Sequence, residues 1–197
     1  MDLIENDFVI EEDLLKEIED NWVQQHFDFD QRDLFIRTLH NREIKYYLET
    51  GFCTGSSSAT VLATTKPEKA ISVGLAFNNM EVAEKLSEQY NFNLIVGDST
   101  QVLTPEFMEK EFPNGIDLYF VDGGHEGQVP LLDMMACVEH LNQDFLIIVD
   151  DYHSKSCPLP DVDAAVDFFV EHSGFKMQAI TTETGKGMAF ITQEESE

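Results

Sequence analysis

The chain has few basic residues, few cysteines and no long apolar run. Of its 197 residues only 12 are Lys or Arg, against 38 Asp or Glu, so the formal net charge is -26. Such a surface repels phosphate backbones and anionic lipids, which argues against nucleic-acid and membrane partners. No apolar stretch reaches membrane-spanning length, and the N-terminus lacks the basic start of a signal peptide.

The three cysteines, Cys53, Cys137 and Cys157, are odd in number and contain no Cys-x-x-Cys pair. We therefore expect reduced thiols in a cytoplasmic protein rather than a disulfide framework. Hydrophobic residues make up 43% of the chain, and 15 residues are Phe, which indicates a folded globular protein. The length suits one domain with a substantial core.

Residues 1–45 are acidic and have apolar residues at helical spacing. We expect this N-terminal helical segment to pack on the sheet or to act as a lid or cap over a ligand site, ahead of the main domain at residues 46–197. The spaced residues are Leu14, Leu15, Ile18 and Trp22, and then Leu34, Phe35 and Leu39.

From residue 45 onward, strand and helix signals alternate. Strands are expected near 45–49, 70–74, 92–96, 117–121 and 145–149, and helices near 56–65, 79–90, 104–111, 129–141 and 161–172. The tail then has two strand-like runs, 175–180 and 188–191, separated by Thr/Gly-rich turn residues. The pattern predicts an α/β fold: a Rossmann-like seven-stranded sheet, mostly parallel, with helices on both faces and an antiparallel C-terminal hairpin strand.

A glycine-bearing turn follows the first strand. Glu49 ends that strand, Gly51 and Gly55 follow, and Ser56 is placed to cap the next helix. Open α/β sheets bind ligands at this edge, and the glycines allow close backbone approach. A bulky residue at Gly51 should then abolish ligand binding while the fold survives. An ordinary glycine turn explains this run equally well when it is taken alone.

Three carboxylates follow neighbouring strands. Asp122 comes after the strand near 117–121, while Asp150 and Asp151 come after the fully apolar strand near 145–149. If these strands are adjacent, the three side chains meet at one edge and repel one another unless a cation neutralises them. Oxygen ligands suit Mg²⁺, and also Ca²⁺ or Mn²⁺. The alternative is that each aspartate caps a helix or accepts from loop amides.

The turn resembles motif I of the class I S-adenosylmethionine (SAM)-dependent methyltransferases. Three further runs are similar to the metal-dependent sugar O-methyltransferases of the macrocin and aminocoumarin type: Asp122-Gly-Gly-His-Glu, Asp150-Asp151-Tyr152, and the stretch from Asp163 to Phe169. The likeness covers about residues 45–191. It implies that Asp122, Asp150 and Asp151 hold a divalent metal such as Mg²⁺.

The resemblance also implies a set of residues that border SAM. Gly74 stands where the family commonly has an acidic residue for the ribose hydroxyls, so Asn78, Asn79 or a backbone group is expected to serve instead. Asp98 matches the family's adenine-side position, although capping of the next helix explains it as readily. The cofactor residues expected from the likeness are Glu49, Gly51, Gly55, Ser56, Asn78, Asp98, Ser99 and Asp122.

The catalytic base is the main departure. Aminocoumarin-type members have a catalytic Asp two residues past the first metal ligand, where this chain has Gly124. His125, which we expect to begin a helix, and His153 are the nearby groups that could accept a hydroxyl proton. Either could instead be a metal ligand or a surface residue.

These features together predict a SAM-dependent, divalent-metal-assisted O-methyltransferase acting on a small hydroxylated acceptor, a sugar or a related metabolite. Two alternatives stay open: a catalytically degenerate SAM-binding protein, and another metal-dependent enzyme on the same scaffold, such as a hydrolase that uses a metal-bound water. The sequence leaves open whether the chain forms a homo-oligomer.

Overall fold

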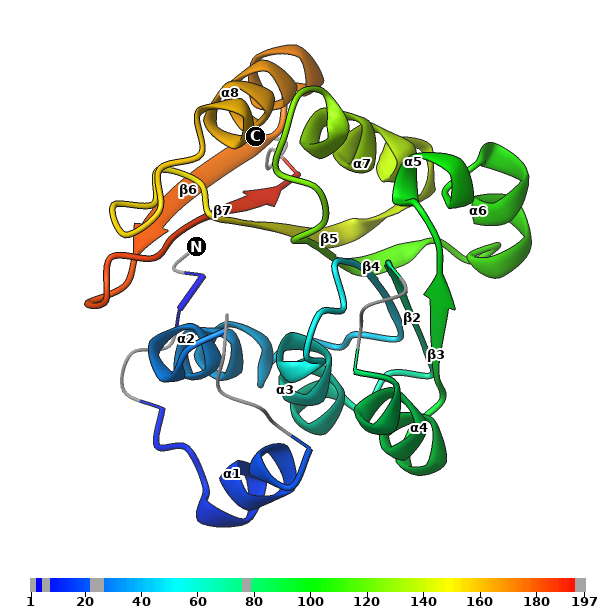
Figure 1. The fold of residues 1–197 in the computed structure, drawn as a ribbon, viewed down its shortest axis with the longest axis vertical. Coiled ribbons are helices and arrows are strands. Elements are labelled where there is room, and N and C mark those ends of the chain that lie inside the picture. Colours follow the sequence, from blue (N-terminus) through cyan, green and yellow to red (C-terminus); the bar gives the residue numbers. More distant parts are fainter. Residues whose placement is uncertain (1–2, 5–7, 22–26, 76–78, 194–197) are drawn as a thin grey trace.

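The computed structural model describes residues 3–4, 8–21, 27–75 and 79–193. A seven-stranded sheet lies between two layers of helices, with the strand order β3-β2-β1-β4-β5-β7-β6 (Figure 1). The strands are β1 Tyr46–Thr50, β2 Lys69–Gly74, β3 Phe92–Val96, β4 Ile116–Val121, β5 Leu141–Asp150, β6 Lys176–Thr181 and β7 Gly187–Thr192. β1 to β5 pair in parallel, and β7 joins β5 and β6 in antiparallel pairs.

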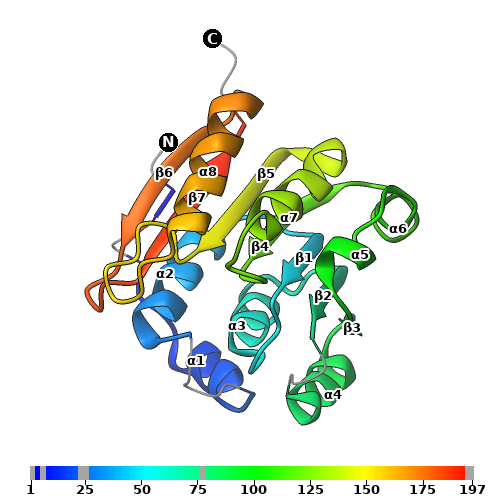
Figure 2. The same ribbon diagram turned by 45° about the horizontal axis from the view of Figure 1, so that its top comes forward.

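The helices alternate with the strands from β1 to β6. They are α1 Glu12–Glu19, α2 Phe29–Leu39, α3 Ser56–Thr65, α4 Met80–Gln89, α5 Ser99–Val102, α6 Pro105–Glu111, α7 Val129–Cys137, a 3₁₀ turn Val138–His140, and α8 Pro160–Ser173. Helices α2, α3 and α4 contribute to the apolar core on one face of the sheet, and α6, α7 and α8 contribute to the core on the other face (Figure 2).

The central strands are apolar because both of their faces are covered. From Phe145 to Asp150, every residue of β5 is buried. Strand β1 pairs with β2 on one side and with β4 on the other, although β4 lies far along the chain. The chain therefore reverses its order at β1, and such a switch point opens a ligand crevice at the carboxyl ends of the strands.

The N-terminal segment is part of the core. Phe35 of α2 packs edge-on against Phe120 of β4, with ring centroids 5.0 Å apart, so α2 lies directly on the sheet. Helix α1 packs outside this layer, where Ile18 meets Ile36 and Ala63. No helix in the described ranges is long and apolar enough to cross a membrane.

The α/β fold expected from the sequence is confirmed, including the C-terminal hairpin. The boundaries differ around β5, which begins at Leu141, while α7 ends at Cys137 rather than near residue 141. The short helix α5 was not expected. Trp22, one of the residues at helical spacing in the N-terminal segment, lies outside the described residues.

Candidate active site

Gly51 allows a close approach of the chain to itself. Its φ is +95°, and a Cβ atom there would lie 1.7 Å from the backbone oxygen of Asp122. Its amide donates to the Val73 carbonyl at 2.9 Å, which ties the turn to β2. Any side chain at Gly51 would therefore displace backbone at the end of β4. The structure contradicts the expectation that a bulky residue at Gly51 would spare the fold.

Glu49 faces inward beneath this turn. Its side chain is fully buried and accepts hydrogen bonds from the Ser57 and Ser58 hydroxyls of α3. Burial raises the pKa of Glu49, and the serine hydroxyls oppose that shift. The expected cap at Ser56 is absent, because α3 begins after Gly55 without a side-chain cap. In this geometry Glu49 holds α3 to β1.

The ends of β2 and β3 carry the other residues expected to border a cofactor. β2 ends at Gly74, and Asn78 lies outside the described residues. Asn79 caps α4 through Val82 N, 3.4 Å away. Asp98 is exposed and caps α5, where its Oδ1 accepts from the amide of Thr100 at 3.0 Å. The helix-capping alternative thus describes Asp98 in this structure.

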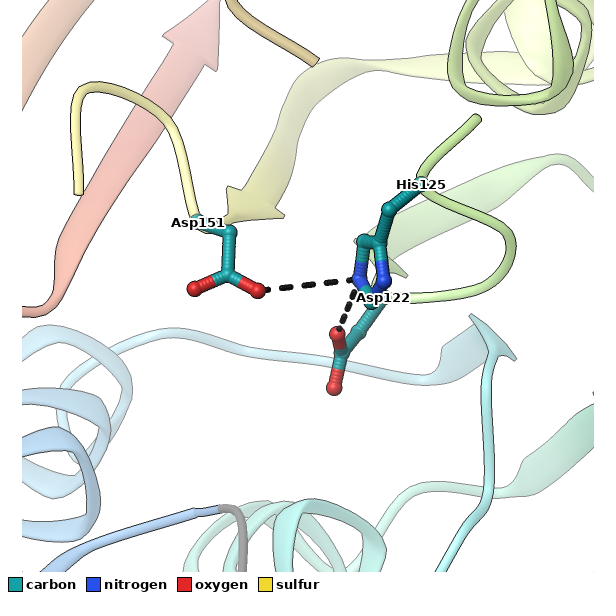
Figure 3. A group of neighbouring side chains, drawn as sticks. All are labelled: Asp122, His125 and Asp151. Carbon is teal, nitrogen blue, oxygen red and sulfur yellow. Dashed lines mark hydrogen bonds and ion pairs between the residues drawn. The ribbon is translucent and has the colours of Figure 1, made fainter. Parts of the chain in front are cut away.

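Asp122, His125 and Asp151 come together at the carboxyl edge of the sheet (Figure 3). His125 Nε2 lies 3.2 Å from Asp122 Oδ1 and 3.7 Å from Asp151 Oδ2. Each of the three side chains offers one ligand atom, and these atoms all lie within 4.8 Å of one another. We call these three residues the acidic group.

Two strand ends create this group. Asp122 directly follows β4, and Asp151 directly follows β5, its φ of +60° turning the chain away from the strand. The turn after β5 is fastened to α8, because the Tyr152 hydroxyl donates to Asp167 at 2.7 Å and the His153 amide donates to Asp163 at 2.6 Å. The separation in sequence between Tyr152-His153 and Asp163–Asp167 thus corresponds to hydrogen bonds that join the turn after β5 to α8.

Asp150 is bound elsewhere. Its Oδ1 accepts a hydrogen bond of 2.8 Å from Gln31 Nε2 of α2, and both side chains are buried. Asp150 is the last residue of β5, whereas Asp151 begins the following turn with a φ of +60°. Burial raises the pKa of Asp150 well above its ordinary value, and the charges of Asp122 and Asp151 add to the shift. Two carboxylates and an imidazole form the acidic group, and Asp150 lies near enough to interact electrostatically with both of these carboxylates.

The two histidines occupy different surroundings. His125 lies in the loop between β4 and α7, which begins only at Val129, so the expected helix start at His125 is wrong. The ring of His153 is exposed and stacks on Tyr152 with centroids 4.0 Å apart. Within the described part of the chain, no hydrogen bond or ion pair joins the His153 ring to the acidic group. The geometry therefore favours His125 over His153 as a functional group.

Two basic side chains, His125 and Lys186, contact the carboxylates of the acidic group. The hydrogen bond with Asp122 raises the pKa of His125. Burial raises the pKa of Asp122, while His125 acts in the opposite direction. On the side away from His125, Lys186 Nζ lies 3.4 Å from Asp151 Oδ1. Neither Lys186 nor Gln31 was anticipated, because both lie far from these strand ends in sequence and follow no motif.

Comparisons with known proteins define the class. Similar solved structures include a methyltransferase of Podospora anserina bound to SAH (17% identity, TM-score 0.69, covering 96% of this chain and 91% of that one). Another is the O-methyltransferase TomG of Streptomyces achromogenes, involved in tomaymycin synthesis and in complex with SAM (16% identity, TM-score 0.67, 94% and 92% coverage). A third is an O-methyltransferase of Bacillus cereus with SAH (13% identity, TM-score 0.69, 95% and 94% coverage). These likenesses establish the fold shared with methyltransferases.

The family follows from the sequence match. Residues 48–152 match the methyltransferase domain family, a stretch that runs from the glycine turn through the acidic group. The chain belongs to this family, and we describe it as a SAM-dependent methyltransferase. A search of curated proteins returned no match.

Proposed function

We propose that this methyltransferase transfers the methyl group of SAM to a hydroxyl of a small acceptor, a sugar or a related metabolite, with the help of a divalent cation. The observation that carries the proposal is the acidic group itself, which lies at the carboxyl edge next to the glycine turn. The acceptor class rests on the sequence likeness around Asp150-Asp151-Tyr152.

The acidic group has the chemistry of a cation site. Burial raises the pKa of Asp122, so its negative charge is poorly compensated by the protein alone. Asp151 faces it across the His125 imidazole, and both carboxylates offer the oxygen ligands that Mg²⁺ and Mn²⁺ accept. We assign the cation to Asp122 and Asp151, where it would act as a Lewis acid on the acceptor hydroxyl.

His125 is our choice for the base. Contact with Asp122 raises the pKa of His125, because the carboxylate stabilises the protonated ring. His125 loses this stabilisation when Asp122 and Asp151 are neutralised, and the neutral ring can then accept the hydroxyl proton. It comes from the loop after β4, at the same edge as the glycine turn, so the base and the cofactor turn converge.

The remaining contribution of the chain is alignment. Transfer from a sulfonium requires the acceptor oxygen, the methyl carbon and the sulfur to lie in line, and holding two reactants in such a geometry contributes much of the rate. We assign SAM to the turn from Gly51 to Gly55 and to the edge formed by Asp98 and Ser99. The acceptor would then lie over Asp122 and Asp151.

A second candidate is a catalytically degenerate SAM-binding protein. Gly74 and Gly124 favour it, because the resembling family has carboxylates at both positions. Calorimetric titrations with SAM and with MgCl₂ separate the possibilities. An active enzyme of the proposed kind binds both ligands and forms SAH with a hydroxylated acceptor. A degenerate protein binds SAM without needing metal, and a chain that binds metal but no SAM contradicts both readings and favours a hydrolase.

A further inference from the structure

A lysine of the C-terminal hairpin reaches the acidic group. Lys186 lies in the turn between β6 and β7, and its Nζ is 3.4 Å from Asp151 Oδ1. The Lys186 side chain is 23% exposed and that of Asp151 is 9% exposed, so the pair is largely shielded from water. In a chain with 12 basic residues against 38 acidic ones, a basic residue at this position calls for an explanation.

The hairpin turn is fixed against the strand end that carries Asp151. Lys186 N donates to Thr182 Oγ1 at 3.1 Å, and the Gly185 oxygen accepts from the Lys155 amide at 2.9 Å. Directly after Lys186, a Cβ atom on Gly187 would lie 2.0 Å from the Tyr152 backbone oxygen. The backbone on both sides of Lys186 is thus held in place.

The N-terminal segment secures the same turn from the other side. The Thr184 amide donates to Asp30 Oδ2 at 3.1 Å, and the Thr184 hydroxyl donates to Asp28 Oδ2 at 2.7 Å. Asp28 also caps α2, the helix whose Gln31 binds Asp150. Segments from both ends of the sequence therefore hold Lys186 at the edge where the carboxylates meet.

The charge of Lys186 acts on all three carboxylates at this edge. Burial tends to lower the pKa of Lys186, but attraction to Asp151 and Asp150 outweighs burial and the pKa is raised. The same ammonium opposes the upward pKa shifts of Asp122 and Asp150. Within the described part of the chain, Lys186 and, when it is protonated, His125 place positive charge beside these carboxylates.

We propose that Lys186 is the built-in counter-cation of the acidic group, and that a divalent cation binds there by displacing the Lys186 ammonium from Asp151. This inference rests on the proposed cation site. The metal-free protein is then stabilised by its own cation, and metal binding is weakened by the loss of that ion pair. Cation affinity would thereby be set by a residue of the C-terminal hairpin, outside the strand-end motifs.

The test is a calorimetric titration of the full chain with MnCl₂. Lys186→Gln should bind Mn²⁺ about tenfold more tightly than the parent, since the competing ammonium is gone. Lys186→Arg keeps the charge and should stay close to the parent. Lys155→Gln is the matched control, because it removes one charge from an exposed site in the adjoining turn. It should change the affinity by less than about twofold.

Thermal unfolding in EDTA provides a second readout. Lys186→Gln should melt below Lys155→Gln without metal, and excess Mn²⁺ should raise its melting temperature more than it raises that of the parent. If Lys186→Gln and Lys155→Gln bind Mn²⁺ more tightly than the parent by the same factor, the inference is overturned. The change in the net charge of the protein would then explain the gain in affinity. Unchanged or weaker Mn²⁺ binding in Lys186→Gln would also overturn the inference.

Failure of the inference and failure of the proposed function give different results. If the parent binds Mn²⁺ and Lys186→Gln shows no gain, the counter-cation role is wrong and the cation site stands. If no variant binds Mn²⁺, both the counter-cation role and the cation-assisted mechanism are wrong. A SAM titration of the same preparations then reports on the methyltransferase assignment by itself.

Discussion

Strand β4 has one carboxylate near its start and another just past its end, and the two differ in the number of their hydrogen-bond partners. Asp117, near the start, accepts hydrogen bonds of 2.8 Å from the Lys45 and Tyr46 amides and of 2.6 Å from Asn142 Nδ2. Asp122, just past the end, has His125 as its close partner at 3.2 Å. One carboxylate is saturated with donors from the chain, and the other is not.

The difference distinguishes a structural carboxylate, Asp117, from one that we propose to be functional, Asp122. Asp117 joins the start of β1 to the start of β5, so its hydrogen bonds are used to hold strands together. At Asp122, burial raises the pKa, which means that the ionised form lacks stabilisation in the free protein. A cation or a substrate hydroxyl can supply what is missing, whereas Asp117 has little left to offer a ligand.

The most direct test of the difference between Asp117 and Asp122 is to neutralise each carboxylate in turn. Asp122→Asn should lose Mn²⁺ binding and slow methyl transfer about a thousandfold, because a Lewis acid contributes several kcal/mol to the transition state. Asp117→Asn should bind Mn²⁺ normally but lower the free energy of unfolding by about 2 kcal/mol, through the loss of charged hydrogen bonds. Calorimetry and urea unfolding measure the two effects.

The stability of the Asp122→Asn variant serves as its control. Without metal it should melt at or above the parent temperature, since repulsion with Asp151 is relieved. A large fall in the stability of this variant would mean that Asp122 has a structural role like that of Asp117. The proposed difference between the two carboxylates would then be wrong.

The two histidines give the next largest effect. His125→Gln should slow SAH formation about 100-fold, the usual contribution of a general base. His153→Gln should leave the rate unchanged, because its ring is exposed and stacked on Tyr152. If His125→Gln instead abolishes Mn²⁺ binding as Asp122→Asn does, the imidazole is a ligand and the base assignment is wrong.

A third carboxylate, Asp133, adds a case in which the cost of burying a charge depends on pH. Asp133 of α7 is 1% exposed, and neither of its oxygens has a hydrogen-bond partner among the described residues. Burial raises the pKa of Asp133 from 3.8 to about 6. Because the folded state holds the proton more tightly, ionising Asp133 costs stability as the pH rises from about 4 to about 6.

Asp133→Asn removes this cost. It should raise the free energy of unfolding by on the order of 2 kcal/mol at about pH 8, and by clearly less at about pH 5. Urea unfolding at the two pH values measures the difference. An equal effect at both would show that packing, not ionisation, is what the substitution changes.

Much of the site could be predicted because it depends on where strands end. Apolar runs with short connections located β4 and β5, and the carboxyl ends of neighbouring parallel strands meet at one edge, so the convergence of Asp122 and Asp151 followed. The hydrogen bond between Asp150 and Gln31 could not be predicted, because the run Asp150-Asp151 gives no sign that the strand ends and a turn begins between the two residues.

The rest depends on contacts that no local pattern encodes. Gln31 lies 119 positions from Asp150, and Lys186 lies 35 positions from Asp151. Neither residue has a spacing or a neighbour that marks it, because each reaches the edge only after α2 and the β6–β7 hairpin have packed. Ser56 was expected to cap the helix, but the contacts of the next two serines were not foreseen: Ser57 and Ser58 donate hydrogen bonds to the buried Glu49.

The contact between Gly51 and the Asp122 backbone has a mechanical consequence. A side chain at Gly51 would overlap the Asp122 carbonyl oxygen, so the turn assigned to SAM and the residue assigned to the cation touch without slack. We expect a shift of either segment to displace the other. If ligands on the two sides favour the same position of this contact, each raises the affinity for the other by the same factor. The cofactor and the cation would then bind cooperatively.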